Sequence, residues 1–150
     1  MNYNEISERL SPCGLHCGMC FAFADGDIVK QSRNLQKLLG NFDLYARRFI
    51  ELLDEPVFGK YPDFKEMLSI FAEGQCKGCR NEKCKLFKNC KVRQCSEDKG
   101  VDFCFQCAEF PCNNTGFDKN LEERTIAINL RMKEIGVESY YEEIKNKSRY

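Results

Sequence analysis

The sequence contains no tryptophan, a single histidine and no excess of either charge, and these shortages exclude several classes of function. With 23 basic and 23 acidic residues, the chain has no overall field that would draw it to nucleic acid or to an anionic membrane. Because His16 is the one histidine, an HExxH metalloprotease site is excluded. The serine hydrolase motif GxSxG and the phosphate-binding motif GxxxxGK are also missing. These shortages point away from the common hydrolases.

Long apolar runs are missing as well. No stretch approaches about 18 consecutive apolar residues, the length that indicates a membrane helix. The opening residues MNYNEISERLSPCGLHC contain no basic cluster followed by an apolar run, so no secretory signal is expected. We therefore expect a cytoplasmic protein with no membrane partner. This matters for the cysteines, because the cytosol keeps thiols reduced.

Hydrophobic periodicity indicates the fold class. Apolar residues recur at steps of three and four over 27–72, with a break at Gly40, and again over 118–135 and 137–144. No segment has the alternation of a useful strand. We predict a mainly α protein, a small helical domain with an irregular cysteine-rich module that metal stabilises. The apolar positions of the helices are expected to form the core.

The chain is short enough to form one domain over 1–150. Within it, residues 1–73 are expected to hold an N-terminal cysteine motif and helices. Residues 74–116 change to frequent Gly, Asn and Lys, and they are expected to form the cysteine-rich zinc module. Residues 117–150 are expected to form the C-terminal helices.

Cysteine is abundant, with 11 residues in the chain. Eight of them lie close together and include two CxxC pairs: Cys76, Cys79, Cys84, Cys90, Cys95, Cys104, Cys107 and Cys112. A CxxC pair turns both sulfurs toward one ion, and two such knuckles are a common frame for tetrahedral zinc. Disulfides are the alternative, but an odd count and a reducing compartment disfavour them. Since this segment has no histidine, it predicts closed four-cysteine sites of the structural type.

Eight ligands suit two zinc ions, and their spacing leaves the pairing open. In a sequential arrangement one ion takes the first four of these cysteines and the other takes the last four. In an interleaved arrangement the two CxxC knuckles share one ion, so that Cys76 and Cys79 join Cys104 and Cys107. The remaining four cysteines then hold the second ion.

Three further cysteines, Cys13, Cys17 and Cys20, have CxxxCxxC spacing near the N-terminus. Radical-SAM enzymes hold an iron–sulfur cluster with such a trio, but the chain is too short and too poor in strands for their barrel. The trio is expected either to form a third metal site, completed by the later cysteines or by His16, or to be buried as free thiols.

A local basic patch leaves a nucleic-acid function open. Residues 76–99 hold eight Lys or Arg side chains against three acidic ones, with Phe87 among them. Such a surface can meet phosphates and stack a base. The alternative is that lysines over 77–93 solvate a loop and offset thiolate charge. The partner, protein or nucleic acid, is left open by the sequence.

The segments CGLHCGMCFAF, CKGC and NCKVRQCSEDKGVDFCFQCAEFPC carry a family resemblance. They resemble the cysteine-rich bacterial and archaeal family of domain of unknown function 3795. The likeness covers both ends of roughly the first 112 residues and includes Arg93, Gly100, Glu109 and Pro111 as well as cysteines.

The resemblance implies a zinc-binding protein without an assigned activity. Its motif cysteines correspond to all those of this chain except Cys84. Relatives often have a cysteine three residues before the one that matches Cys90, where this chain has Phe87. The ligand set that includes Cys90 therefore stays open.

The hypothesis from sequence is a binding or interaction module whose structural zinc ions, two or three in number, are held by cysteines. No catalytic residue is assigned, and an enzyme is the less favoured class. One alternative is an iron–sulfur redox or electron-carrying protein. Others are a nucleic-acid-binding zinc protein and an enzyme with one reactive thiolate.

Overall fold

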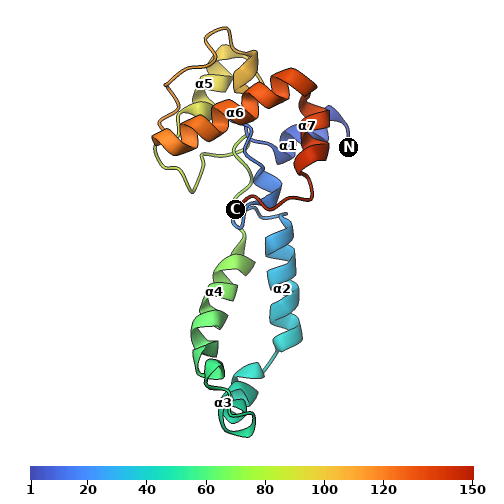
Figure 1. The fold of residues 1–150 in the computed structure, drawn as a ribbon, viewed down its shortest axis with the longest axis vertical. Helices are drawn as coiled ribbons and strands as arrows, with labels where there is room; N and C mark the ends of the chain where they lie inside the picture. Colours follow the sequence, from blue (N-terminus) through green and yellow to red (C-terminus); the bar gives the residue numbers. More distant parts are fainter.

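Seven α-helices and three short 3-10 helices form a head and a projecting arm in the computed structural model, which covers residues 1–150 (Figure 1). The α-helices are α1 (Tyr3–Arg9), α2 (Asp27–Leu39), α3 (Phe42–Leu52), α4 (Tyr61–Glu73), α5 (Val92–Lys99), α6 (Lys119–Ile135) and α7 (Val137–Ile144). The 3-10 helices are η1 (Cys17–Met19), η2 (Pro56–Lys60) and η3 (Cys104–Gln106). The predicted mainly α class is confirmed. The seven-residue helix α1 was not predicted from the apolar pattern.

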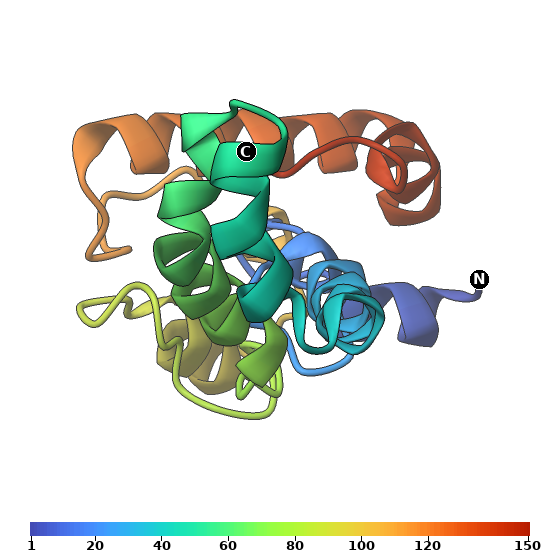
Figure 2. The same cartoon turned by 90° about the horizontal axis from the view of Figure 1, so that it is seen from below.

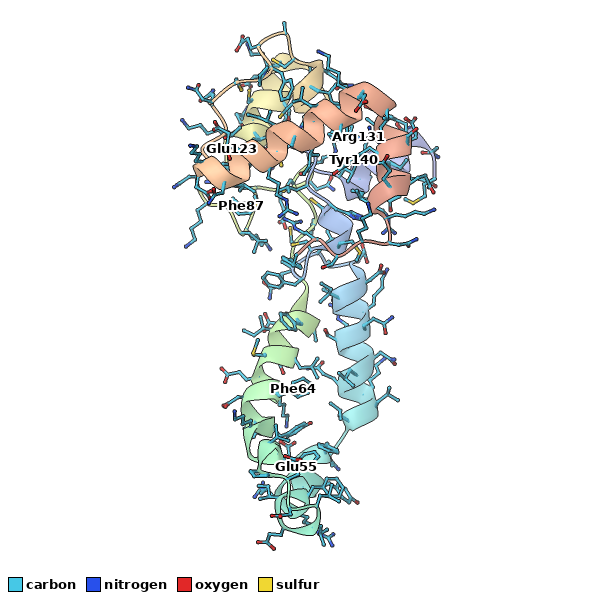
Figure 3. All side chains as sticks on the ribbon, viewed as in Figure 1. Glu55, Phe64, Phe87, Glu123, Arg131 and Tyr140 are labelled. Atoms are coloured by element: carbon cyan, nitrogen blue, oxygen red, sulfur yellow. The ribbon has the colours of Figure 1, made fainter.

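The arm is an antiparallel pair of helices, α2 and α4, with α3 and η2 at its free end (Figure 1). Figure 3 shows Glu55 at this end and Phe64 part-way along the arm. The Arg33 side chain joins the two long helices, because its Nε donates to the Ala72 carbonyl at 2.8 Å and its Nη2 to the Glu73 carbonyl at 3.0 Å. These bonds satisfy carbonyls that the end of α4 leaves without helical partners.

Ten large apolar residues of the arm are exposed, contrary to the expectation that the apolar positions form the core, whereas Val29, Tyr61 and Leu68 are buried. Two antiparallel helices cover one another on one side only, so their remaining apolar side chains face water. Leu38 is 76% exposed, Leu52 65% and Leu44 61%. The other exposed apolar residues of the arm are Leu35, Tyr45, Leu53, Val57, Phe64, Met67 and Ile70.

The main core lies in the head, where α1 and α7 pack with α6 and the loop before η3. Its buried members are Ile6, Leu10, Phe103, Met132, Val137, Tyr140 and Tyr141. Phe103 is fully buried although it belongs to the cysteine-rich segment. That segment therefore shares the helical core, whereas the sequence predicted that it relies on metal alone.

Asn129 of α6 connects three parts of the head through its side-chain amide. Its Nδ2 donates to the carbonyls of Cys13 and Thr125 at 2.8 and 2.9 Å, and its Oδ1 accepts from the Phe105 amide at 3.0 Å. Gly14 lies against the same helix with φ +86°, and a Cβ there would sit 2.3 Å from Ile128 Cγ2. The loop that carries Cys13 can therefore approach α6 closely only with glycine at this position.

Figure 2, seen from below, shows the arm end-on in front of the head, with α6 along the upper edge. Gly40, the predicted break between α2 and α3, has φ +49°. Asp118, the predicted cap of α6, accepts a hydrogen bond from the Leu121 amide at 3.1 Å.

No helix is both long and apolar enough to cross a bilayer.

Replacing Asn129 with Ala is expected to lower the free energy of unfolding by about 2–4 kcal/mol, because it leaves the Cys13 carbonyl and the Phe105 amide buried without their partner. Urea unfolding followed by circular dichroism measures the change. The control is Asn120→Ala on the exposed side of α6, which should stay within about 0.5 kcal/mol of the parent. Equal losses in the two variants would contradict the role given to Asn129.

Candidate metal centre

All eleven cysteines carry free thiols, and they line two small cavities of the head. The four-thiol cavity is lined by Cys95, Cys104, Cys107 and Cys112. The seven-thiol cavity is lined by Cys13, Cys17, Cys20, Cys76, Cys79, Cys84 and Cys90. Each cavity has a volume of about 30 Å³. Pockets for organic ligands typically measure about 300–1,000 Å³, so these cavities suit an ion and not a substrate.

The four-thiol cavity lies between α5 and the loop around η3. Helix α5 supplies Cys95, η3 begins at Cys104, and the loop that follows supplies Cys107 and Cys112. The Glu109 amide donates to Cys107 Sγ at 3.4 Å. Val92, Val101 and Phe110 add apolar surface, and polar side chains complete the lining, namely those of Ser96, Lys99, Asn114 and Thr115. Burial raises the pKa of the Cys104 thiol to about 12.

The seven-thiol cavity forms where the N-terminal loop meets the CKGC knuckle. The Cys76 amide donates to the Ala22 carbonyl and the Ala24 amide donates to the Cys76 carbonyl, both at 2.8 Å. This pairing brings Cys17 and Cys20 beside Cys76 and Cys79 although more than fifty residues separate them in sequence. As expected for a sharp knuckle turn, Gly78 has φ +92°.

Backbone amides point at cysteine sulfurs in this cavity also. The Gly78 amide donates to Cys76 Sγ and the Phe87 amide to Cys84 Sγ, each at 3.4 Å. Such bonds favour the thiolate, which is the form that binds metal. Ser11 Oγ and Cys13 Sγ are hydrogen-bonded at 3.0 Å. The loops that carry Cys76 and Cys84 thus fold so that backbone amides donate hydrogen bonds to the sulfur atoms.

Cys79 lies between two other thiols of the cavity. Interaction with the Cys79 side chain lowers the pKa of Cys17 to about 6 and that of Cys84 to about 5. The same interactions raise the pKa of Cys79. Burial raises the pKa of Cys13 to about 11.

The C-terminal tail returns to the seven-thiol cavity. Arg149 lines the cavity and donates from Nη1 to the His16 carbonyl at 2.9 Å. The Tyr150 hydroxyl accepts from the Phe21 amide at 3.2 Å and lies 3.9 Å from Cys20 Sγ. Sequence reasoning missed both residues, because nothing in the local sequence links the tail to cysteines about 130 positions earlier.

His16 does not line the seven-thiol cavity. Its ring packs edge-on against Tyr141 with centroids 5.4 Å apart, and its Nε2 is buried without a hydrogen-bond partner. Burial lowers the pKa of this imidazole to about 4. The N-terminal trio thus meets Cys76, Cys79, Cys84 and Cys90, and not the histidine.

As the side chains stand, no three Cys, His, Asp or Glu residues form a finished metal-binding group. The donor chemistry nevertheless fits zinc, because each cavity offers at least four thiols in apolar surroundings. The four-thiol cavity has the membership of the sequential arrangement. The interleaved arrangement requires Cys104 and Cys107 to share a cavity with Cys76 and Cys79. They do not share one.

Part of the predicted basic patch is used within the fold. The Arg80 Nε donates to the carbonyls of Ser7 and Leu10 at 2.6 and 3.1 Å, its Nη2 donates to that of Asp102 at 2.9 Å, and its guanidinium lies 4.8 Å from the Phe103 ring centre. Phe87 packs against Phe117, with ring centroids 5.7 Å apart. These contacts leave a smaller basic surface than the sequence indicated.

The sequence model of the family described as protein of unknown function (DUF3795) matches residues 9–117. The chain belongs to this family. The matched segment contains all eleven cysteines and the arm, whereas Arg149, which also lines the seven-thiol cavity, lies outside it. Comparisons with curated proteins and with solved structures find no match.

Arg80→Lys is expected to lower the free energy of unfolding by about 1.5–3 kcal/mol, because lysine lacks the planar fork that serves three carbonyls. Chemical denaturation of the purified protein tests this. Arg47→Lys, at an exposed position of α3, is the matched control and should change the stability by less than about 0.5 kcal/mol. A neutral result at position 80 would show that its hydrogen bonds are dispensable.

Proposed function

We propose that this protein is a zinc-binding interaction module, in which structural zinc ions bound by cysteines fix a helical arm to the head. The observation that carries the proposal is the distribution of thiols, because the fold gathers all eleven into two small cavities. Cys95, Cys104, Cys107 and Cys112 would hold one ion in a closed tetrahedral site. The seven-thiol cavity would hold zinc as well.

The position of the seven-thiol cavity supports a structural role. Cys20 precedes α2 by a few residues and Cys76 follows α4 by a few residues, so the cavity lies at the root of the arm. A metal bound there would join both ends of the arm to the head. Closing such a long loop removes freedom from the unfolded chain, as a disulfide does.

The exposed apolar side chains of the arm favour a binding role over catalysis. Ten of the large apolar residues that face water belong to α2, α3, α4 and η2 and the turns between them. Exposed apolar side chains gathered on one part of a soluble protein are typical of protein interaction sites. We propose that the arm binds an apolar protein surface while the zinc-bound head holds it in place.

Zinc content tests the metal half of the proposal. Protein purified with and without oxygen should contain zinc by elemental analysis, and Cys95→Ser should lose one ion while the seven-thiol cavity keeps its metal. The control is Ser96→Ala, which alters the lining of the four-thiol cavity without removing a thiol. Iron with visible charge-transfer absorption would contradict the proposal and favour the iron–sulfur alternative.

Self-association tests the binding half, because a surface that binds apolar partners also binds itself weakly when concentrated. Sedimentation of the parent should show a weight-average mass that rises with concentration. The triple variant Leu38→Gln, Leu44→Gln and Leu52→Gln should remain monomeric. Leu130→Gln, at a residue of α6 that is 50% exposed, is the control on the head and should behave as the parent. A parent protein that stays monomeric at millimolar concentration would contradict the proposal that the arm binds apolar protein surfaces.

A further inference from the structure

A third cavity of the head lies between α6, α7 and the C-terminal tail, and no cysteine lines it. Its volume is about 120 Å³. Ile128 and Ile144 supply apolar surface, while Arg124, Lys147 and Arg149 bring three positive charges to the lining. No aspartate or glutamate lines this cavity. We call it the basic cavity.

The two arginines of the basic cavity are held in place without being neutralised. Arg124 Nη2 donates to the Arg149 carbonyl at 2.7 Å, and Arg149 Nη1 donates to the His16 carbonyl at 2.9 Å. A carbonyl oxygen fixes the position of a guanidinium but carries no net charge to offset it. Because like charges beside one small cavity repel one another, an anion between them would be stabilised.

Other cations of the same region do have carboxylate partners. Arg131 of α6 pairs with Glu143 at 2.5 Å, and Lys145 pairs with Glu142 at 2.5 Å. Neither Arg131 nor Lys145 lines the basic cavity. Two carboxylates of α7 are thus paired with cations outside the cavity, whereas the three cations that line it take part in no ion pair.

Tyr140 of α7, labelled in Figure 3, adds a hydrogen-bond donor to the basic cavity. The residue is only 7% exposed, yet its hydroxyl makes no hydrogen bond within the protein and is not sealed from solvent. Burial raises the pKa of Tyr140 and Arg124 lowers it in part, as expected for a hydroxyl within electrostatic range of the guanidinium. Buried tyrosines usually place this hydroxyl against a partner, so an unused donor here indicates a ligand with acceptor atoms.

We propose that the basic cavity binds a phosphate-type oxyanion, either inorganic phosphate or the phosphate end of a monoester. Phosphate suits the site better than a carboxylate, because a dianion offsets more of the positive charge and its oxygens match the fork of a guanidinium. Whole organic ligands need about 300–1,000 Å³, so the rest of a monoester would extend into solvent. Arg124 and Lys147 are exposed, which leaves the cavity open to an ion from solution. This inference does not depend on zinc.

Titration with inorganic phosphate tests the site. Amide chemical shifts of the ¹⁵N-labelled protein are followed at low ionic strength, where binding between charges is least screened, and chloride serves as the salt control. We expect saturable shifts that fit one site per chain, with a Kd below about 1 mM. The shifts should concentrate around Arg124, residues 14–16 and residues 147–149.

Two variants assign the binding to the basic cavity. Lys147→Gln should weaken phosphate binding about tenfold, since it removes a charged donor. Its matched control is Lys133→Gln, which removes the same charge from an exposed position of α6 outside the lining and should change the Kd less than about twofold. Arg149 is left unchanged because it also lines the seven-thiol cavity.

Tyr140→Phe tests the hydroxyl separately, because it keeps the ring and its packing. It should weaken phosphate binding about threefold, the effect of losing one neutral donor, and leave the free energy of unfolding unchanged. Circular dichroism of each variant confirms that it is folded. An unchanged Kd in Tyr140→Phe would remove this hydroxyl from the site.

The choice of anion separates the remaining outcomes. Phenyl phosphate that binds more tightly than inorganic phosphate would identify a monoester as the ligand, and equal or weaker binding would identify free phosphate. Acetate that binds as tightly as phosphate would overturn the phosphate assignment. Shifts that do not saturate, or equal weakening by Lys147→Gln and Lys133→Gln, would overturn the site itself.

Discussion

The hydrogen bonds of the Asn129 side chain are the contacts on which the architecture of the head depends. They connect α6 to the loop of Cys13 and to the start of η3, and so place one wall of each cavity against the same helix. A second bond supports this junction, because the Cys104 amide donates to the Pro12 carbonyl at 3.0 Å. A buried side-chain amide whose donors and acceptor are all hydrogen-bonded fixes the relative position of the segments it joins. Apolar packing alone is less directional.

This junction explains how the two cavities lie side by side without mixing their thiols. Cys13 and Cys104 pack together in a small cluster with Leu15 and Val92, yet Cys13 lines one cavity and Cys104 the other. The two sets of sulfurs therefore meet at this cluster while each lines its own cavity. Since thiolates repel one another, the charge of each set would be offset by its own metal if the proposed ions are bound.

The sequence predicted the helices of the arm well, because periodic apolar residues and breaks such as Gly40 are local signals. It did not tell which of those residues face water, since an exposed arm and a buried hairpin have the same periodicity. It also predicted the membership of the four-thiol cavity as one of two alternatives, because Cys95 and Cys104 are near in sequence. It offered the meeting of the N-terminal trio with later cysteines as one possibility but not which cysteines take part, because the pairing of Cys76 with Ala22 and Ala24 depends on the arm folding back upon itself. The roles of Asn129, Arg80 and Arg149 likewise arise from contacts between distant segments.

The placement of the seven-thiol cavity connects the metal chemistry to the binding role. The arm packs against the head only at its root, where α2 meets η1, so few contacts hold its direction, and a freely moving arm would lose entropy on binding a partner. Residues next to both ends of the arm line the cavity, namely Cys20 before α2 and Cys76 after α4. Metal bound there would restrict the arm before any partner arrives, so part of the ordering cost would be met during folding. On this argument, zinc bound as proposed would contribute to affinity without touching the partner.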